Sequence, residues 1–298
     1  MKTEENTPQP IKVNPNVGMN RKKKKISIKK TILYSFMSFV ALLQIFPLIW
    51  LVNFSFLRSG EFFGDSFLKW PDEFQWINYI NAFTQGNVPR YLMNSLFVTL
   101  VSVALAAIIS VLMAYAFTRM KWKLNKVVMN IILLGMIIPI HATLLPNFIL
   151  FNHFNLLDSP LSLILPYTAF SLPISMFIMS GFMETLPKEL EESAVMDGAG
   201  LFSIIFRVIF PLTTPAIATI SVLNFINWWN EFIMANTFLV SEEKKTLPFS
   251  IMKFAGEYSS NYGAQFAVMT IIVIPSIIIY VLFSKYITKG ITAGAVKG

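Results

Sequence analysis

Charged residues divide the chain into a polar N-terminal segment and six long runs that contain no Lys, Arg, Asp or Glu. These runs cover residues 31–57, 91–118, 127–157, 159–183, 208–230 and 258–284. Each run is longer than the roughly 20 apolar residues that a helix needs to cross a bilayer. The pattern therefore predicts an all-α membrane protein with six transmembrane helices, each somewhat shorter than its run.

Small residues and prolines within the runs predict how these helices pack and bend. The second run is rich in small residues, which allow neighbouring helices to approach closely. They are Ala104, Ala106, Ala107, Ser110, Ala114 and Ala116. The other five runs contain prolines, including Pro139 and Pro211. A proline bends a helix within a bundle, so bends are expected, either as fixed shape or as points of movement.

A long charged interruption between the later runs, residues 184–207, has the order of residues that two short helices require. Pro187 suits a first helical position, and the glutamates that follow it suit the positive end of a helix dipole. A helix of about ten residues is expected there. Asp197, Gly198 and Gly200 then tolerate a turn. An amphipathic helix pair at the membrane surface would fit this pattern, as would a docking site for a partner protein.

The composition indicates the class of protein and excludes several kinds of site. Hydrophobic residues make up 55% of the chain and charged residues only 13%, which indicates an integral membrane protein. The absence of cysteine excludes disulfides and thiolate metal sites, and two histidines are too few for a histidine-rich metal cluster. We therefore expect no metal and no cofactor bound by this chain.

Basic residues predict the orientation in the membrane. The segment 1–30 carries nine basic and two acidic residues, nearly all of the net charge of +8. With a cytoplasmic N-terminus, 18 basic residues fall on inner segments and six on outer ones, which favours both termini inside. The segment 1–30 is interpreted as a disordered cytoplasmic tail, with a nucleic-acid-binding arm as the alternative.

Polar residues at membrane depth are candidates for a substrate pathway. Glu231 is the only carboxylate close to the interior of a predicted span, and it follows two tryptophans that could stack on a sugar ring. Alternatively, the tryptophans form an interfacial belt and Glu231 reaches the outer headgroups. His141 could line the same route or pack as an ordinary side chain. The pathway candidates are Trp228, Trp229, Asn230, Glu231 and His141.

The charged interruption resembles the "EAA" loop of the permease subunits of ABC importers. Glu192-Ser193-Ala194 is followed by Asp197-Gly198 and later by Ile209-x-Pro211, with Ser193 in place of the first alanine of the family pattern. The resemblance implies coupling helices that sit in a cleft of an ATP-hydrolysing subunit. The residues it assigns to this role are Glu191, Glu192, Ser193, Ala194, Asp197, Gly198, Ala199 and Phe202.

Two further motifs resemble the MalG-like permeases of carbohydrate ABC importers. They are Trp229-Asn230-Glu231-Phe232 with Thr246-Leu247-Pro248, and the C-terminal sequence GITAGAVKG. The resemblance covers residue 31 to the end. It implies a type I importer permease fold, a second related permease subunit, two ATPase subunits that bind ATP and Mg, an extracellular solute-binding protein and a sugar or oligosaccharide as substrate.

The same resemblance assigns two contact surfaces. Contact with the binding protein falls on the external loop 241–263, at Gly256, Tyr258, Ser259, Asn261 and Tyr262. Contact with the ATPase falls on the C-terminal tail 285–298, at Thr292, Ala293, Gly294 and Lys297. The chain thus divides into a tail, 1–30, and a permease domain, 31–298, in the cytoplasmic membrane of a bacterium.

The sequence lacks the motifs of an ATPase or of another enzyme. It contains no Gly-x-x-x-x-Gly-Lys-Ser/Thr, and no nucleophile, base and orienting group can be assembled from its motifs. ATP hydrolysis is therefore expected from separate subunits. Two alternatives of other classes are a stand-alone secondary transporter or channel for a small polar solute, with Glu231 as its one buried acid, and a membrane scaffold without a transport role.

Overall fold

The computed structural model describes residues 28–63, 69–256 and 260–295, with side chains described up to residue 285. The chain divides into two compact units, Met1–Leu48 and Ile49–Gly298. Within the described residues of the first unit there is only the start of α1, Ile28–Phe54. Residues 1–27 of the predicted tail, 1–30, therefore lie outside the described residues. The regular secondary structure of the described residues is helical, apart from one isolated bridge between Ala255 and Ser260, and turns and loops connect the helices.

Four of the six predicted spans are single helices. They are α1, α3 (Val88–Thr118), α6 (Leu161–Met183) and α12 (Tyr262–Ala295), whose apolar part ends at Lys285. Each is long and apolar enough to cross a membrane. The absence of charged residues was thus sufficient to locate these four helices, but the expectation that each is shorter than its run is wrong for α3 and α12, which are longer.

The other two predicted spans are bent. The first consists of α4 (Asn125–Leu134), η2 (Gly135–Ile137), η3 (Ile140–Thr143) and α5 (Leu144–His153), and its halves meet at 96°. Ile138 and Pro139 are extended at the break, as expected for a proline and the residue before it. The described residues therefore contain six spans if each bent pair counts as one.

The second bent span follows the predicted docking loop. It begins with α8 (Leu201–Ser203), continues as a π-helix, η4 (Ile204–Ile209), and then as α9 (Phe210–Leu212) and α10 (Thr214–Trp229). Its two halves meet at 74°. Pro211 and Pro215 lie on the two sides of the bend. Proline and a π-helical turn are both recognised causes of helix bending.

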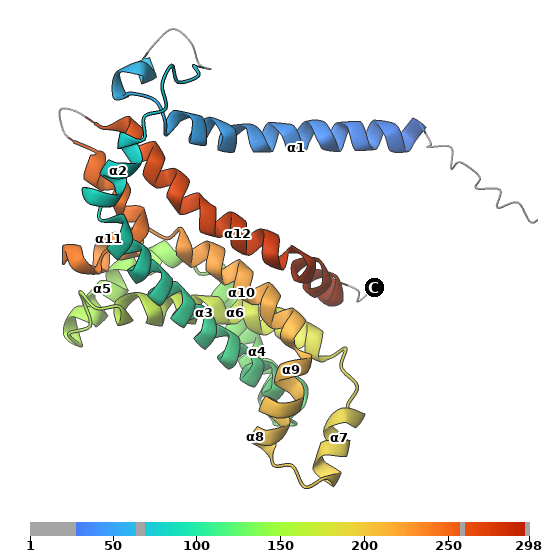
Figure 1. Cartoon of the computed structure of the whole chain (residues 1–298). Coiled ribbons are helices and arrows are strands. Elements are labelled where there is room, and N and C mark those ends of the chain that lie inside the picture. Colours follow the sequence, from blue (N-terminus) through green and yellow to red (C-terminus); the bar gives the residue numbers. More distant parts are fainter. Residues whose placement is uncertain (1–27, 64–68, 257–259, 296–298) are drawn as a thin grey trace, which may run out of the picture. The chain divides into compact units, whose positions relative to one another are not determined.

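Short elements connect the spans. Four of these elements lie at the N-terminal end of α3. They are η1 (Ser59–Phe63), α2 (Ile77–Thr84), η5 (Glu242–Lys244) and η6 (Leu247–Phe254). The remaining two are α7 (Glu189–Met196), at the opposite end of α3, and α11 (Ile233–Phe238), which follows α10. Figure 1 shows α2 and α7 at opposite ends of α3.

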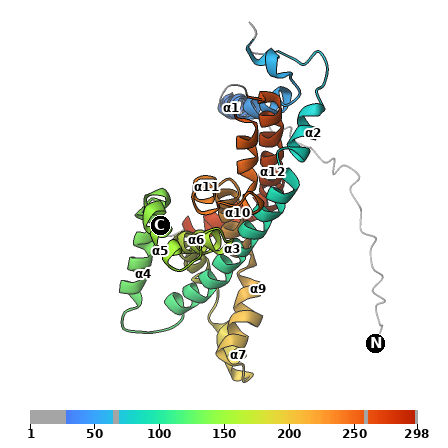
Figure 2. The same cartoon turned by 90° about the vertical axis from the view of Figure 1, so that its left-hand side faces the viewer.

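The core of the second unit lies between α3, α6, α10 and α12. Helices α3 and α6 pack along much of their length, and α10 contacts both α3 and α12. Of the six predicted small residues of α3, Ala106, Ala107, Ser110 and Ala114 are buried, which confirms close packing at these positions, whereas Ala104 is exposed and Ala116 is half-buried. Figure 2 shows α4 and α5 beside α6, with α4 in contact with α6. This core holds both ends of the unit in place.

Candidate functional site

A hollow of about 510 Å³ lies where the bent span α4–α5 meets the C-terminal end of α10. It brings together four of the five predicted pathway residues, which come from segments about 90 residues apart in the sequence. Its lining consists of Ile140, His141, Asn227, Trp228, Asn230, Glu231, Phe232 and Ile233. The break at Pro139 places His141 here, in η3, directly after the bend.

Glu231 is buried, with 9% of its surface exposed, and its carboxylate has three hydrogen-bond donors. The Tyr167 hydroxyl donates to Oε2 at 2.5 Å, while the backbone N–H groups of Met234 and Ala235 donate at 2.7 and 3.2 Å. The two N–H groups belong to the first turn of α11, so Glu231 satisfies donors that a helix start leaves unpaired. The interpretation that Glu231 reaches the outer headgroups is therefore wrong.

The two tryptophans face different surroundings. Trp228 stacks on Tyr167, with ring centroids 4.6 Å apart and planes at 7°, and its indole N–H donates to the Ser171 hydroxyl at 2.8 Å. It also lines the hollow. Trp229 is fully buried and donates to the carbonyl of Ile272 on α12. Trp229 therefore does not line the hollow, because successive residues on a helix point about 100° apart and the side chain of Trp229 faces α12 instead.

A row of polar contacts joins α6 and α10 below the hollow. Tyr167 and Ser171 contact Glu231 and Trp228, as described above. One turn further along α6, Ser175 accepts a hydrogen bond of 2.9 Å from the Asn224 amide. All three α6 residues are buried, and they recur every four residues, which places them on one helix face. Sequence reasoning missed this row, although its spacing of four within an apolar run was visible.

The polar side chains that remain open to the hollow suit a hydroxyl-rich ligand. His141 and Asn227 are exposed within this chain, and an imidazole and an amide can each donate and accept hydrogen bonds. Asn230 uses its amide N–H on the Ile226 carbonyl, which leaves its side-chain oxygen as an acceptor. Together with the Trp228 indole, they combine an aromatic surface with hydrogen-bonding groups. Sequence reasoning did not single out Asn227.

A second hollow of about 330 Å³ adjoins the first and shares Asn230 and Phe232 with it. Pro248, Ile251 and Met252 of η6 also line it, together with Ile272 of α12. Phe232 packs on Phe249, with ring centroids 6.4 Å apart. The structure thus places the segment 229–232 beside the segment 246–248, two motifs that are separated in the sequence.

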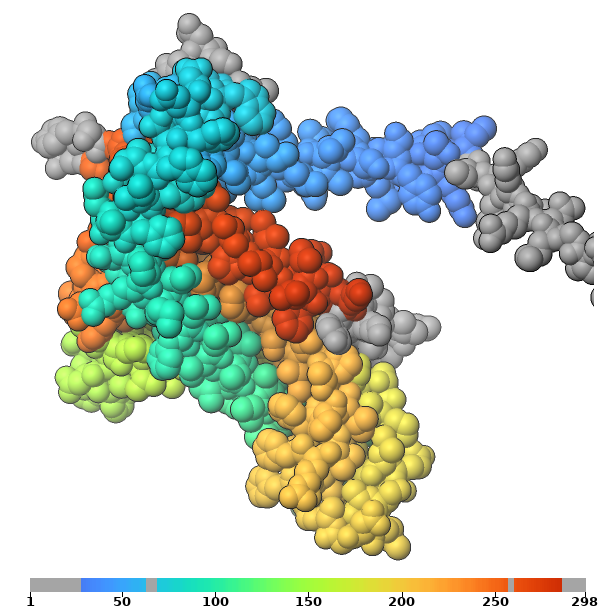
Figure 3. All heavy atoms as spheres, viewed as in Figure 1, coloured from blue at the N-terminus to red at the C-terminus, as the bar shows by residue number. Residues whose placement is uncertain are grey.

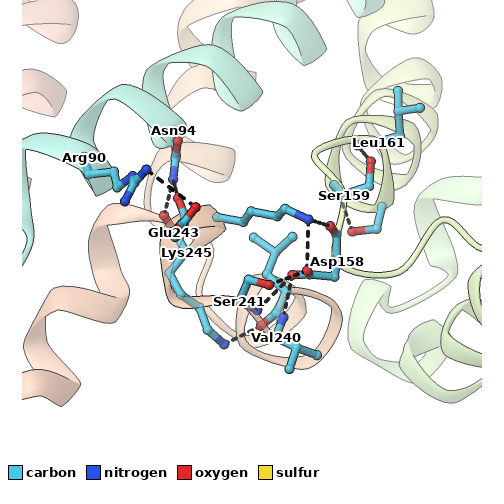
Figure 4. A network of polar contacts seen from close by, with 12 residues as sticks. Arg90, Asn94, Asp158, Ser159, Leu161, Val240, Ser241, Glu243 and Lys245 are labelled. Carbon is cyan, nitrogen blue, oxygen red and sulfur yellow. Dashed lines mark hydrogen bonds and ion pairs between the residues drawn. The ribbon is translucent and has the colours of Figure 1, made fainter.

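A network of polar contacts fixes the segment 239–245 between α3 and the turn before α6 (Figure 4). Asp158 accepts hydrogen bonds from the Ser241 hydroxyl and N–H, from the Val240 N–H and from Lys244. Burial acts to raise the pKa of Asp158, but the hydrogen bonds from Ser241, Lys244 and Val240 outweigh it and hold the pKa well below its ordinary value. Asp158 is therefore an anionic anchor.

The other side of this segment is fixed to α3. The Asn94 amide donates to the carbonyls of Glu243 and Lys245 at 2.8 and 2.9 Å. Lys245 is buried, donates to the Leu239 carbonyl and lies 4.4 Å from the centroid of the Phe249 ring. The Tyr91 hydroxyl donates to Glu242 at 2.7 Å. This segment is thus a folded part of the unit.

The predicted binding-protein surface is only partly described. Gly256 is exposed, and Tyr258 and Ser259 lie outside the described residues. The Asn261 side-chain oxygen accepts hydrogen bonds from the Ala264 N–H at 3.1 Å and from Ser59 at 3.0 Å, so it caps α12. Tyr262 begins α12 and packs on Phe62. The flanks of the loop are therefore held in place by contacts of their own.

The predicted docking loop contains α7, which begins at Glu189 and has eight residues. Pro187 is therefore not the first helical residue, and the helix is shorter than expected. Gly198 has φ +80° with open space around it, which confirms the predicted turn. Glu192 and Ser193 are exposed, as is Asp197.

The side chains of this loop are divided between the core and the outside. Ala194 and Ala199 pack against the core beside Met183 and Ile205. Apolar side chains on the other side are exposed, with Met196 86%, Phe202 71% and Val195 57% exposed. Figure 3 shows α7 and α8, in yellow and orange, open to the outside on the viewed face. An exposed apolar patch with acidic neighbours is typical of an interaction site.

Sequence reasoning counted Arg119 only as a charge, but this residue joins three elements. It follows the last residue of α3. Its Nη2 donates to the carbonyls of Met183 and Leu186 at 2.9 and 2.8 Å, and its Nε lies 2.8 Å from Oε1 of Glu191 on α7. The contact with Glu191 is an ion pair rather than an aligned hydrogen bond. Its partner Glu191 was among the predicted coupling residues.

The predicted C-terminal contact surface lies at the end of α12. Thr292, Ala293 and Gly294 continue this helix, and Lys297 lies outside the described residues. Within the described part of the chain, no cluster of three or more His, Asp or Glu side chains could hold a metal ion. The hollow and the docking loop are thus the two candidate functional regions.

Comparisons with known proteins agree with this architecture. The family described as "Binding-protein-dependent transport system inner membrane component" matches residues 106–293. A putative ABC transporter permease protein, ORF2, from Caldicellulosiruptor sp. strain Rt8B.4 is 37% identical, over 89% of this chain and 96% of the relative. The trehalose/maltose transport system permease protein MalG of Thermococcus litoralis is 31% identical, over 87% and 94%.

A solved structure has the same fold over most of both chains. It is a chain from the crystal structure of a bacterial ABC transporter involved in the import of the acidic polysaccharide alginate. The similarity has a TM-score of 0.75 with 25% identity and covers 87% of this chain and 96% of that chain. The expected importer permease fold is therefore confirmed.

Proposed function

The chain belongs to the binding-protein-dependent transport system inner membrane components, and from this membership we propose that it moves a sugar or oligosaccharide through the cytoplasmic membrane as one permease subunit of an ABC importer. The observation that carries the sugar assignment is the hollow lined by Trp228, His141 and Asn227. Its aromatic and hydrogen-bonding groups match the apolar faces and hydroxyls of a sugar, and relatives are named for sugars such as trehalose and maltose.

The proposal assigns the energy to partner subunits. A permease of this family is not itself an enzyme, and we place ATP and Mg on two separate ATPase subunits. The exposed apolar side chains of Met196 and Phe202, with the acidic residues of α7, form the surface proposed to dock on them. A second, related permease subunit would complete the pathway, and an extracellular binding protein would deliver the sugar.

The orientation follows from the basic residues. With the N-terminus in the cytoplasm, the loop 184–207 faces the ATPases, and the loop 241–263 at the other end of α3 faces the binding protein. In this orientation the inner segments carry 18 basic residues and the outer segments carry six, which supports the arrangement. The external contact surface remains assigned to Gly256 and the residues up to Tyr262, and the C-terminal contact to the end of α12.

The geometry supports alternating access in this chain. Helices α3 and α6 pack as a pair, while the π-helix η4 and the bend of 74° lie between the docking loop and α10, which lines the hollow. Closure of the ATPases would move α7 and change the access to the hollow at the far end of α10. The ion-coupled alternative gains no support, because the Glu231 carboxylate already accepts three hydrogen bonds.

Purification of the tagged chain in mild detergent, followed by mass spectrometry of the proteins that remain bound, tests the proposed assembly. The proposal predicts a second six-span permease, an ATPase with a Gly-x-x-x-x-Gly-Lys-Ser/Thr motif and a solute-binding protein. Recovery of the chain alone, active in vesicles without ATP, would contradict it and favour a secondary transporter.

A further inference from the structure

The Arg119 guanidinium occupies the point where three elements of the docking end meet. Arg119 directly follows the last residue of α3. Its guanidinium donates to the carbonyl of Met183, the last residue of α6, and to that of Leu186, three residues later, and it pairs with Glu191 in the first turn of α7. The side chains of Arg119 and Glu191 are only 6% and 13% exposed. A single side chain thus connects two membrane spans with the proposed docking helix.

This arrangement differs from a surface ion pair, which contributes little because water screens it. Here both charges are largely removed from water, so each depends on its partner. The Met183 and Leu186 carbonyls lie at the end of a helix, where a positive charge is favoured. A guanidinium has several donors in one plane and can serve all three acceptors, whereas a lysine ammonium is a point charge on a flexible stem.

The other contacts between α7 and the spans are small. Ala194 and Ala199 pack against the core through single methyl groups, and the longer apolar side chains of α7, Met196 among them, face outward. Tyr115, one turn before Arg119 on α3, is a second α3 side chain that interacts with Glu191. Arg119 and Tyr115 therefore add specific polar contacts to the packing of α7 against η4.

We propose that Arg119 is a positioning residue that makes α3, the end of α6 and α7 move as one body, so that the force received by α7 reaches the membrane spans. This inference rests on the proposed function, in which the loop 184–207 docks on an ATPase. It assigns to Arg119 a role in coupling: without the guanidinium, α7 still follows the ATPase, but the spans follow α7 incompletely.

The test uses the complete importer in proteoliposomes, and it measures sugar transported per ATP hydrolysed. The variants are Arg119→Gln, Arg119→Lys, Glu191→Gln and the double variant Arg119→Gln/Glu191→Gln. The matched control is Lys121→Gln, which changes an exposed charge two residues after Arg119. The amount of assembled complex is measured for every variant, so that a loss of folding is separated from a loss of coupling.

The expected result is a fall in sugar per ATP of about fivefold or more for Arg119→Gln and for Glu191→Gln, the lower end of typical coupling effects. Because the two residues act as a unit, the double variant falls no further than the single ones. Arg119→Lys recovers part of the ratio, since it keeps the charge but not the three contacts. The control Lys121→Gln keeps the ratio of the unaltered importer.

The inference is overturned if both single variants keep the ratio of the unaltered importer, or if they lower only the amount of complex. If Arg119→Gln does not assemble, Glu191→Gln decides, because it leaves Arg119 on its two carbonyls. Failure of the proposed function would look different: the unaltered chain would then show no ATP-dependent uptake at all.

Discussion

The Tyr167 hydroxyl donates a hydrogen bond of 2.5 Å to the carboxylate of Glu231, and both side chains are buried. This contact links α6 to the start of α11, and the ring of the same tyrosine stacks on Trp228. An unpaired carboxylate would be costly at membrane depth, whereas this one is held by three donors. The contact therefore makes Glu231 a group that positions the wall of the hollow rather than a free ligand for the sugar.

The first prediction concerns this contact. Tyr167→Phe keeps the ring stacked on Trp228 but removes one donor from the buried carboxylate, which is expected to reduce the free energy of unfolding by about 1–3 kcal/mol. Thermal unfolding of the purified complex measures the change. Tyr280→Phe is the matched control, because Tyr280 is 54% exposed and its replacement is expected to have little effect. Equal unfolding temperatures for Tyr167→Phe and the unaltered protein would contradict the account.

The second prediction separates the two tryptophans. Trp228→Ala removes an aromatic surface from the hollow and is expected to raise the sugar KM, by about tenfold if the contact is worth 1.4 kcal/mol. Trp229→Phe alters a fully buried ring and its hydrogen bond to Ile272, so it is expected to lower stability and leave the KM of the remaining folded complex unchanged. Uptake at several sugar concentrations tests both. A KM effect of Trp229→Phe larger than that of Trp228→Ala would refute the assignment of the hollow.

The third prediction uses two glycines of the docking loop. Gly198 has φ +80°, which proline cannot adopt and alanine adopts with strain, whereas Gly200 has φ −76°. Both have open space around them. Gly198→Pro is expected to abolish sugar uptake with the chain still in the membrane, and Gly198→Ala to lower it. Gly200→Ala is the control and is expected to retain normal uptake. Normal uptake by Gly198→Pro would remove the basis for assigning this turn to coupling.

The fourth prediction concerns acid stability at the other end of α3. The pKa of Asp158 lies below its ordinary value of 3.8 in the folded protein. Its ionised form therefore stabilises the fold at neutral pH, and this contribution is lost as the pH falls from about 4 through the lowered pKa. Asp158→Asn is expected to lower the unfolding temperature at pH 7, with a difference that shrinks below pH 4. Asp72→Asn is the control, because the Asp72 side chain is 83% exposed and its replacement is expected to have little effect. A difference that does not depend on pH would contradict the assignment.

The sequence predicted the parts of the fold that depend on composition and local order. Runs of uncharged apolar residues located the six candidate spans, four of which are single helices, and the order of glutamates and glycines predicted the helix and turn of the docking loop. Pro139 and Pro211 lie at or beside the two bends, whereas Pro47, Pro166, Pro173 and Pro275 lie inside single helices. The angles of 96° and 74° were not predictable, because they depend on how the two halves pack against neighbouring helices.

The candidate site was predicted only in part, because local order in the sequence identifies a motif but does not show which of its side chains face each other in space. Residues 228, 230 and 231 are close in the sequence, so a motif identified them, but which tryptophan faces the hollow depends on the rotation of α10 about its axis. Arg119 and Tyr167 could not be assigned from the sequence, because their partners Glu191 and Glu231 are 72 and 64 residues away. Contacts of this kind become visible only when the helices are placed in space.

The central claim is that this chain imports sugar with energy from ATP, and uptake into proteoliposomes tests it most directly. The vesicles contain the purified assembly, ATP is placed on the side of the docking loop, and the binding protein with labelled sugar is placed on the other. The account predicts sugar accumulation that requires both ATP and the binding protein. Accumulation that proceeds without ATP and follows a proton or sodium gradient would contradict it.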